Sequence, residues 1–598
     1  MTYTSAATPG RQAMAGLLLL AVCVAAYELG GGAKLGEHEC LVAQTAREMM
    51  ASGDYVSPHY GGQLRLRKTP LAYWTAVAVS RLTGRLDEWT VRLPSAAAGV
   101  ALVMVTAALG TSLFGRRTGL VAGFVAATSV AYFKFTHDAT VDMQLALWCT
   151  LCYWCFWRGT HAERAWPRRL WMWGCYVSLG VAMLAKAPMP AAVVVLPLLV
   201  YWFIVPVLRR GPMLVAMARR GRGGPAVTTV GALLKRAVFR LPQLCVLSGA
   251  AIFLIVFLPW VLAVLAQHGF DDVLTRWKSE YLDRYTGDLR IEKDPGAWYY
   301  LPYVFGFVLP WALSVPEAVA AAFLQRYRRI RRELWYPLTW FVVTLAFISS
   351  AGFKKAHYLL PAVPAMWLLL APVLERLFFG PQARHRGREA WAALAIVATV
   401  LAALVAGGVL LRWWVPAYRD LLPAYTVLAL ILGFGIGVAG IAFAAGRRAI
   451  SFVLIGAGSI GGFMWFWPTI AAAEAGNAEA LAFAQTIQRT VPPDAELRWL
   501  RRQDAQVLFY GERPIGRFME AIEVLRQLGD RRRDMEAIRQ TLGDALDARL
   551  RDDEPIWLIM REQDCWALTT LMGTPLRKVA SGTVSGKEMV IVTNTIDE

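Results

Sequence analysis

Charged residues that could do chemistry stand at the ends of several apolar segments of this sequence. The first group is Glu37-His38-Glu39, which precedes a basic run containing Arg67 and Lys68. Further groups follow along the chain: Asp138 and Asp142, Lys186, Glu280 and Arg284, and finally Lys354, Lys355, His357 and Tyr358. Burying a charge at the end of an apolar helix is costly unless a partner or a substrate compensates it. These positions therefore predict a functional site.

Carboxylates beside several cations at a membrane surface suit one type of reaction. Lys and Arg hold phosphate through charge-assisted hydrogen bonds. A carboxylate within hydrogen-bonding reach of an acceptor hydroxyl or amine can serve as general base for attack on a sugar carbon. Lipid phosphate would then be the leaving group, which needs cationic stabilisation. The residue types favour transfer of a sugar from an anionic lipid.

A divalent metal ion is compatible with the same residues. The ligand types that could converge are Glu37, His38, Glu39, His59, Asp142 and His357. No pair of them has zinc-protease spacing, so the sequence leaves metal dependence open. Cys149, Cys152 and Cys155 lie in an apolar run where a helix would spread them around its circumference. A metal cluster at these cysteines, or a disulfide framework, is not indicated.

The elements that position these residues are predicted to be membrane-spanning helices. Of the 598 residues 57% are hydrophobic and only 18% are charged, which is too apolar for an ordinary soluble chain. Crossing about 30 Å of hydrocarbon takes roughly 20 apolar residues. Thirteen segments are long enough, near residues 12–29, 93–114, 118–134, 141–158, 169–186, 188–207, 241–266, 300–324, 335–351, 357–378, 390–412, 424–445 and 449–471. The first could instead be a secretory signal.

Loop charges predict the orientation of these helices, because short cytoplasmic loops carry an excess of Lys and Arg. The basic loops alternate along the chain and lie at residues 115–119, 158–169, 209–224 and 325–334 and in the later runs ARHRGRE and GRRA. This places the N-terminus in the cytoplasm and the first outer loop, residues 30–92, on the outer face of the membrane. Because much of the net charge of +19 reads as this topology signal, nucleic acid is not predicted as a partner.

The tail alternates helical patterns with short β-like runs. The runs ELRWL, VLFY, PIWLIM and MVIVT are β-like, whereas AEALAFAQTIQRTV and MEAIRQTLGDALDARL have helical spacing. The predicted fold class is therefore an α-helical polytopic membrane protein of about 13 transmembrane helices, with interfacial helices in the first outer loop and a C-terminal soluble α/β domain. Residues 1–475 form the first predicted domain and residues 476–598 the second, which is periplasmic.

Several motifs occur in the order seen in a known family. They are EHECLVAQTAREMMASGDYVSPHYGGQLRLRKTPLAYW, DEWTVRLPSAAAG, ATVDMQLALW, MLAKAPMPAA, SEYLDRYTGD, PGAWYYLPYVFGFVLPW and KKAHYLLPAVPA. Through them, residues 12–380 resemble bacterial type C glycosyltransferases related to protein O-mannosyltransferases and the lipid A aminoarabinose transferase. The resemblance implies inverting transfer of a monosaccharide from a polyprenyl-phosphate-linked donor to a lipid A, glycan or protein acceptor. Some relatives of this kind work without a metal.

The resemblance also implies roles for individual residues. The family usually has an Asp-Glu pair in the first outer loop where this chain has His38-Glu39, so the catalytic base is open between Glu37 and Glu39. Asp142 matches the family's second acidic site. The residues expected to hold the lipid phosphate are Lys68, Lys186, Arg284, Lys354 and Tyr358, with His38, Arg67, Glu280 and Lys355 as further candidates.

Two other classes of protein explain less of the sequence. A transporter or flippase of lipids or solutes should have charged groups near the bilayer midplane in two related halves. Asp142 and Lys186 instead lie at span ends, and no repeat is apparent. A scaffold that binds a partner through its tail does not explain the cations in separate outer loops. The glycosyltransferase is the main prediction and the transporter the alternative, while the sugar and the acceptor stay open.

Overall fold

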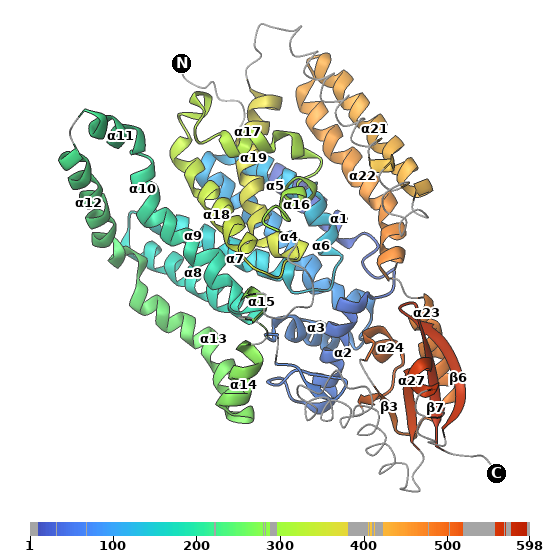
Figure 1. The fold of residues 1–598 in the computed structure, drawn as a ribbon. Coiled ribbons are helices and arrows are strands. Elements are labelled where there is room, and N and C mark those ends of the chain that lie inside the picture. The colour runs from blue at the N-terminus through green and yellow to red at the C-terminus, as the bar shows by residue number, and fades with distance from the viewer. Residues whose placement is uncertain are drawn as a thin grey trace. The chain divides into compact units, whose positions relative to one another are not determined.

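The computed structural model divides into two compact units (Figure 1). It describes residues 10–31, 33–66, 68–220, 223–278, 280, 283–286, 296–380, 422–475, 478–500, 503–517, 556–566 and 576–594, with isolated positions at 405, 407–409, 412 and 569. The helical unit comprises Met1–Leu29, Leu66–Ala72 and Arg92–Thr469. The mixed unit comprises Gly30–Arg65, Tyr73–Val91 and Ile470–Glu598.

The chain is a multi-pass membrane protein. Six described helices are long and apolar enough to cross a bilayer: α4 (Glu88–Phe114), the continuous stretch Ala191–Leu208, α13 (Val246–His268), the stretch Ala356–Phe379, α21 (Leu422–Ala444) and the part Arg448–Thr469 of α22 (Arg448–Ala475). Two bent pairs raise the number to eight, α5 (Arg116–Ala127) with α6 (Val130–Thr136), and α16 (Leu301–Phe307) with the stretch Trp311–Ala320. The two pairs bend by 56° and 118° respectively.

Shorter or more polar helices occupy the other predicted segments. They are α1 (Arg11–Ala26), α7 (Asp142–Thr160), α8 (Ala165–Lys186) and α18 (Arg331–Ser349), while α11 (Gly211–Arg219), α12 (Gly223–Phe239), α14 (Phe270–Trp277) and α15 (Asp283–Thr286) connect spans. The stretch Ala191–Leu208 consists of η1 (Ala191–Val195), α9 (Leu196–Leu199), η2 (Val200–Ile204) and α10 (Val205–Leu208). The stretch Ala356–Phe379 consists of η7 (Ala356–Ala362) and α19 (Val363–Phe379), and α17 is Val315–Ala320. Most of the predicted span 390–412 lies outside the described residues, so the number thirteen stays a prediction.

Aromatic residues that join helices form much of the core of the helical unit. Tyr153 on α7 stacks on Trp340 of α18 with ring centroids 3.8 Å apart. The Tyr153 hydroxyl donates to the Val193 carbonyl oxygen at 2.7 Å, and the Trp340 indole donates to the Pro361 carbonyl oxygen at 3.0 Å. Buried Tyr and Trp side chains need such acceptors for their polar hydrogens. These bonds therefore tie α7 and α18 to the neighbouring spans.

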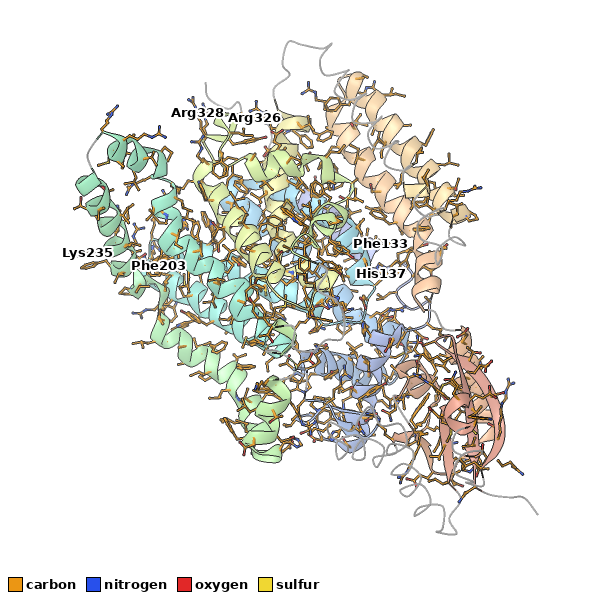
Figure 2. The ribbon with its side chains drawn as sticks, viewed as in Figure 1. Phe133, His137, Phe203, Lys235, Arg326 and Arg328 are labelled. Carbon is orange, nitrogen blue, oxygen red and sulfur yellow. The ribbon has the colours of Figure 1, made fainter. Side chains whose placement is uncertain are left out.

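A second aromatic cluster joins α6 to α22. Phe133 lies on α6 and His137 directly follows the helix (Figure 2), with ring centroids 4.7 Å apart. The ring of Trp467 on α22 lies 5.5 Å from that of Phe133 and 5.1 Å from that of His137. The His137 ring nitrogens contact the Phe133 and Tyr27 carbonyl oxygens at 2.6 and 2.7 Å. This buried histidine therefore serves packing between α1, α6 and α22.

Small residues allow α4 and α5 to pack closely. A Cβ atom on Gly119 of α5 would lie 2.6 Å from both the Ala107 carbonyl oxygen and the Thr111 amide nitrogen of α4. A Cβ atom on Gly110 of α4 would in turn lie 3.1 Å from the Gly119 Cα. Close backbone approach at small residues is a common way for membrane helices to associate, because lipid provides no hydrophobic drive between them.

The tail contributes a five-stranded sheet to the mixed unit. The strands are β3 (Leu497–Trp499), β4 (Gly516–Arg517), β5 (Trp557–Arg561), β6 (Arg577–Val584) and β7 (Lys587–Thr593), in the order β4-β3-β5-β7-β6. β3 pairs in parallel with β4 and β5, whereas β7 runs antiparallel to β5 and β6. Trp557 and Ile559 pack on one face with Phe483 of α23 (Ala478–Thr490), and Leu558 packs on the other. This alternation is the period of a strand.

One predicted β-like run of the tail is wrong. ELRWL, PIWLIM and MVIVT contain strands β3, β5 and β7, but VLFY lies in helix α24 (Ala505–Tyr510). The side chain of Asp504 accepts hydrogen bonds from the backbone amides of Gln506 and Val507, which caps the start of this helix. The cap outweighs the strand preference of the run. The segment MEAIRQTLGDALDARL lies outside the described residues.

The first predicted outer loop folds together with the tail. It contains α2 (Glu37–Ser52), the short hairpin of β1 (His59–Tyr60) and β2 (Gln63–Leu64), and most of α3 (Leu71–Thr83). The Leu35 amide donates to the Tyr510 hydroxyl oxygen at 2.7 Å, and Gln506 donates to the Leu35 carbonyl oxygen at 2.8 Å. Burial raises the pKa of Tyr510, so its hydroxyl stays protonated and donates to Glu88 at 3.1 Å.

We expect Gly119→Ala to destabilise the protein by about 1–3 kcal/mol, because the added methyl group overpacks the contact with α4. The measurement is the thermal unfolding midpoint of the purified protein in detergent. The matched control is Gly437→Ala in α21, where an added Cβ meets nothing within 4 Å among the described residues. Alanine is the better helix former, so this control should be neutral or slightly stabilising. Equal midpoints for the two variants would contradict the packing argument.

Candidate active site

A cavity of about 460 Å³ in the helical unit brings several predicted site residues together. Lys68, Glu280, Lys186 and Tyr358 line it. The remaining lining residues are mostly apolar: Thr69, Ala187, Pro188, Met189, Ala192, Tyr285, Phe347, Ile348, Ala351 and Phe353. The cavity therefore combines cationic groups with apolar walls.

Asp142 and Lys186 form a buried ion pair. Asp142 begins α7 and Lys186 ends α8; because a short loop connects these helices, the start of one meets the end of the other. The Lys186 Nζ lies 2.7 Å from Asp142 Oδ1, and the two side chains are 13% and 7% exposed. An acid at a helix N-terminus and a base at a C-terminus also suit the helix dipoles. The same Nζ lies 4.7 Å from the ring centroid of Tyr358.

Lys68 is paired with Glu280, which lies 212 residues further along the chain. The Lys68 Nζ is 2.7 Å from Glu280 Oε1. Glu280 is almost fully buried, whereas Lys68 is 34% exposed and faces the cavity. The predicted residue Arg67 lies outside the described residues. Only the backbone of Arg284 is described, within α15.

The predicted residues around η7 lie near the same cavity or beside residues that line it. Lys354 is buried with 4% of its surface exposed. The Lys355 Nζ lies 5.2 Å from the ring centroid of Phe353, and the His357 ring meets that of Tyr358 edge-on at 4.9 Å. These contacts place the group beside two aromatic walls of the cavity.

Tyr285 and Phe353 also line the cavity but were not singled out from the sequence. The Tyr285 carbonyl oxygen accepts from the Gly352 amide at 2.9 Å, and its hydroxyl lies 2.8 Å from Ser350 Oγ. This contact holds the short helix α15 to the end of α18. The available signal was an aromatic residue within SEYLDRY and another directly before the lysines, a pattern too common at membrane boundaries to mark a site.

The predicted acids of the first outer loop belong to the mixed unit and begin α2. Glu39 is buried, and its Oε2 accepts from the Gly36 amide at 2.9 Å, which caps the helix. Glu37 and His38 are exposed. Glu37 lines a pocket of about 250 Å³ formed mainly by tail residues, among them Asp504 and Lys587. Of the two candidate bases, Glu37 is the more accessible.

The metal candidates do not form a donor set in the described part of the chain. No three His, Cys, Asp or Glu side chains among the described residues gather as a metal ion would require. Glu37, His38 and Glu39 are neighbours on one helix of the mixed unit, and His357 belongs to the helical unit. The His59 Nδ1 contacts the Ser57 carbonyl oxygen at 2.9 Å. These residues alone therefore do not fit a metal site.

Comparisons with known proteins agree with the resemblance seen in the motifs. Residues 67–218 match the family model of dolichyl-phosphate-mannose-protein mannosyltransferases. An undecaprenyl phosphate-alpha-4-amino-4-deoxy-L-arabinose arabinosyl transferase of Edwardsiella ictaluri is 28% identical over 372 residues, which cover 61% of this chain and 60% of the relative. A protein of the same name from Pseudomonas savastanoi is 28% identical over 439 residues, 70% of this chain and 71% of the relative.

The fold matches that of a solved structure along nearly the whole chain. The crystal structure of ArnT from Cupriavidus metallidurans bound to undecaprenyl phosphate is similar with a TM-score of 0.72 and 21% identity, covering 98% of this chain and 97% of the other. The fold is therefore that of a type C glycosyltransferase. The family-model match, the relatives and the fold together support the superfamily of polyprenyl-phosphate-dependent type C glycosyltransferases that the motifs resemble.

We expect Asp142→Asn and Lys186→Met each to destabilise the protein by about 3–5 kcal/mol, because each leaves a buried charge without its partner. The double variant should lose less stability than the sum of the losses in the two single variants. Thermal unfolding midpoints of the four proteins give the coupling. Asp272→Asn is the control: it breaks the exposed pair with Arg276 and should cost at most about 1 kcal/mol. Additive losses in the double variant would show that the pair is not coupled.

Proposed function

We propose that this protein is an inverting glycosyltransferase that moves a monosaccharide from a polyprenyl-phosphate-linked donor to an acceptor. The reaction takes place at the outer face of the bacterial inner membrane, and the acceptor is a lipid A, glycan or protein molecule. The observation that carries the proposal is the cavity with Lys68 and Lys186 beside apolar walls. The names of the relatives support it, and none of the proteins compared above is named a transporter.

The two lysines bind the donor phosphate. An ammonium group has three N–H donors, and the Asp142 carboxylate accepts one from Lys186. The remaining donors of Lys186 can hold phosphate oxygens through charge-assisted hydrogen bonds. Because Asp142 and Glu280 hold the two ammonium groups in place before the donor arrives, less conformational freedom is lost on binding. Lys354 and Tyr358 add a charge and a phenol to the phosphate site.

The apolar walls bind the isoprenoid chain of the donor. Phe347, Ile348 and Phe353 line the cavity on the side of α18 and the loop that follows it, and Pro188 and Met189 line it after α8. Removing isoprenoid carbon from water contributes about 25 cal/mol per Å² of buried surface. Specificity for a lipid phosphate then follows from having both parts in one cavity, because a free sugar phosphate makes only the polar contacts.

The chemical step is a single displacement at the anomeric carbon. A carboxylate takes the proton of the acceptor hydroxyl or amine, and the acceptor atom forms a bond to the anomeric carbon from the face opposite the phosphate. The bond between that carbon and the phosphate oxygen breaks, and polyprenyl phosphate leaves with the electron pair. Lys68 and Lys186 stabilise the charge that develops on the leaving oxygen. One displacement inverts the anomeric configuration.

The proton acceptor is assigned to the acids at the start of α2. Glu37 is exposed, whereas Glu39 supports the segment by capping the helix. Asp142 acts by holding Lys186 in the orientation that the phosphate needs. Under this assignment Glu37 is the base, and Glu39 and Asp142 are positioning residues.

We expect Glu37→Gln to lower kcat for transfer by at least about 100-fold, the usual size of a general-base contribution. Glu39→Gln and Asp142→Asn should also lower kcat, because each substitution weakens a contact that holds a site residue in position. The purified full chain is incubated with a synthetic polyprenyl-phosphate sugar and bacterial envelope extract, and mass spectrometry follows release of polyprenyl phosphate. Glu163→Gln, at an exposed position in a predicted cytoplasmic loop, is the control. Full activity in all three folded variants would overturn the assignment.

We expect Lys186→Gln and Lys68→Gln to weaken binding of polyprenyl phosphate by about 10- to 100-fold, since a hydrogen bond to a charged group contributes roughly 1.5–3 kcal/mol. Binding of the uncharged polyprenol should change little. Lys235→Gln on α12, whose exposed lysine is labelled in Figure 2, is the control. Microscale thermophoresis measures the affinity of each variant and of the unaltered protein for the two lipids. Equal affinity of the lysine variants and the unaltered protein for the phosphate lipid would contradict this role.

A further inference from the structure

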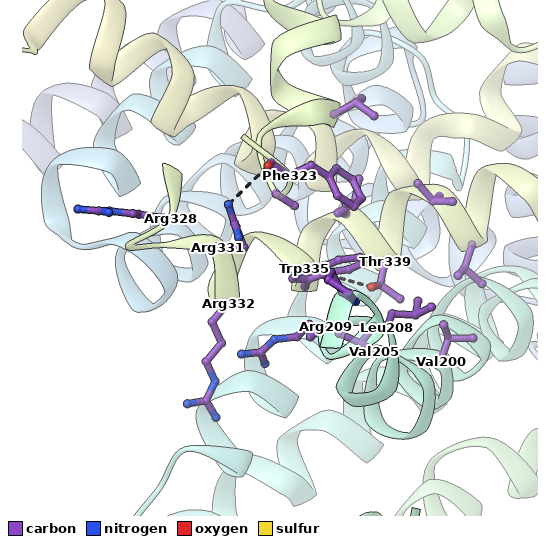
Figure 3. A pocket seen from close by; sticks show the side chains of 16 residues that line it. Val200, Val205, Leu208, Arg209, Phe323, Arg328, Arg331, Arg332, Trp335 and Thr339 are labelled. Atoms are coloured by element: carbon purple, nitrogen blue, oxygen red, sulfur yellow. Dashed lines mark hydrogen bonds between the residues drawn. The ribbon is translucent and has the colours of Figure 1, made fainter. Parts of the chain in front are cut away.

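The helical unit contains a second cavity, of about 860 Å³, that shares no residue with the first (Figure 3). It lies between the segment around α10 and the residues of α17 and α18. Its walls are formed by Val200, Val205, Leu208, Pro212, Val319, Ala322, Phe323, Trp335, Leu338, Thr339, Val342 and Val343. Four arginines complete the lining: Arg209, Arg328, Arg331 and Arg332.

The four arginines gather at one end of this cavity. Arg209 directly follows α10, whereas Arg328 precedes α18, and Arg331 and Arg332 begin that helix. Arg209 and Arg328 are 119 residues apart in sequence. Among the described residues, none of the four has a carboxylate within ion-pair distance. By contrast, the neighbouring Arg326 is paired with Glu317 at 3.1 Å. The cavity therefore has an excess of positive charge.

Arg331 offers a buried donor within this group. Its Nη2 is 3.5 and 3.4 Å from the carbonyl oxygens of Phe323 and Leu324, which are long hydrogen bonds. Its Nε atom is buried and has no hydrogen-bond partner among the described residues. A buried donor without an acceptor costs roughly 1–3 kcal/mol, so an oxygen-rich anion at this position would be stabilised.

Like charges oppose each other at the mouth of the cavity. Figure 3 shows the guanidinium groups of Arg209 and Arg332 extending to the same side. Burial lowers the pKa of Arg209, and the charge of Arg332 lowers it further, whereas Tyr201 and the Glu333 carboxylate act in the opposite direction without cancelling the shift. An anion between the two groups would replace repulsion by attraction.

The rest of the cavity is an apolar strip whose length fits within one leaflet of a bilayer. On α18 it runs from Trp335 to Val343, a rise of eight residues, or about 12 Å at 1.5 Å per residue. The hydrocarbon of one leaflet is half of about 30 Å. A cationic end above an apolar strip of this length fits the phosphate of a phospholipid and the part of its acyl chain nearest the head group.

We propose that this cavity is a binding site for an anionic phospholipid. The phosphate lies on the arginines, and an acyl chain lies along Leu338, Val342 and the valines of the facing segment. Basic recesses between membrane helices on the cytoplasmic side are suited to anionic head groups, and both arginine loops are predicted to face the cytoplasm. A soluble anion would leave the apolar strip unused. The lipid would hold the segment around α10 against α18.

The test compares anionic and zwitterionic lipids on the purified, delipidated full chain. Phosphatidylglycerol or phosphatidylcholine with matched acyl chains is added in mixed micelles, and native mass spectrometry counts the lipid molecules retained. Phosphatidylglycerol should be retained at least tenfold more strongly and should raise the thermal unfolding midpoint. Equal retention of the two lipids would overturn the proposal.

The decisive variant is the double substitution Arg328→Gln/Arg332→Gln. Neither side chain has a hydrogen bond or ion pair within the described structure, so the fold should tolerate the change. Phosphatidylglycerol retention should fall at least tenfold. The matched control is Arg326→Gln/Arg329→Gln, which removes the same charge from the same loop at positions that do not line the cavity; Figure 2 labels Arg326 and Arg328 on that loop. An equal fall in the control would show general charge attraction and overturn the proposal.

A second variant tests the apolar strip with the charges intact. Val342 is 46% exposed, so Val342→Trp should fold while filling the strip and lowering phosphatidylglycerol retention. Glycerol phosphate, which has the head group without a chain, should not raise the unfolding midpoint at the same concentration. Stabilisation by glycerol phosphate equal to that by phosphatidylglycerol would mean a head-group site only and would overturn the lipid assignment.

Discussion

An ammonium group at the end of an apolar helix must find a negative partner, because burying an isolated charge costs more free energy than a fold can supply. Two such pairs organise the helical unit. Lys186 and Asp142 join the last turn of α8 to the first turn of α7, and Lys68 and Glu280 join the segment 66–72 to the residues after α14. Lys68, Lys186 and Glu280 line the cavity, and the first pair joins the ends of α7 and α8.

Buried ion pairs of this kind fix the positions of their side chains more than they stabilise the fold. Well-packed apolar residues in place of a buried pair are often as stable or more so. What an apolar replacement cannot supply is a cation already oriented toward a phosphate. Under the proposed function, a lysine fixed by a carboxylate would have that orientation before the donor binds, which is the preorganised electrostatic stabilisation typical of enzymes.

The sequence predicted the positions of single residues better than their partners. Asp142 and Lys186 were expected at helix ends, since apolar run lengths define where spans stop. Glu280 was read beside Arg284 because the two are one helical turn apart, whereas the structure pairs it with Lys68 across 212 residues. Such a pairing depends on the packing of several spans, which periodicity does not contain. The helix at VLFY likewise depends on one cap at Asp504.

The second cavity, which is lined by four arginines, also could not be predicted from the sequence. Basic residues in short loops have a general explanation in membrane topology, so each loop alone predicts only which side it faces. That two loops bring four guanidinium groups to one end of an apolar strip follows from helix packing. Glu39 is a related case: its position predicted an acid at a catalytic motif, but its cap on α2 required the backbone geometry.

The joining of the first outer loop to the tail has a consequence for how the protein is made. Leu35 and Tyr510 are 475 residues apart, and Arg47 donates to the Phe509 carbonyl oxygen across 462. At about 5–20 residues per second, a ribosome makes the second partner roughly 25 to 95 s after the first. The segment that carries Glu37 is therefore synthesised before most of the membrane spans and long before the tail residues that it contacts. A chain halted before residue 503 would have its membrane helices but not the tail residues that Leu35 and Arg47 contact.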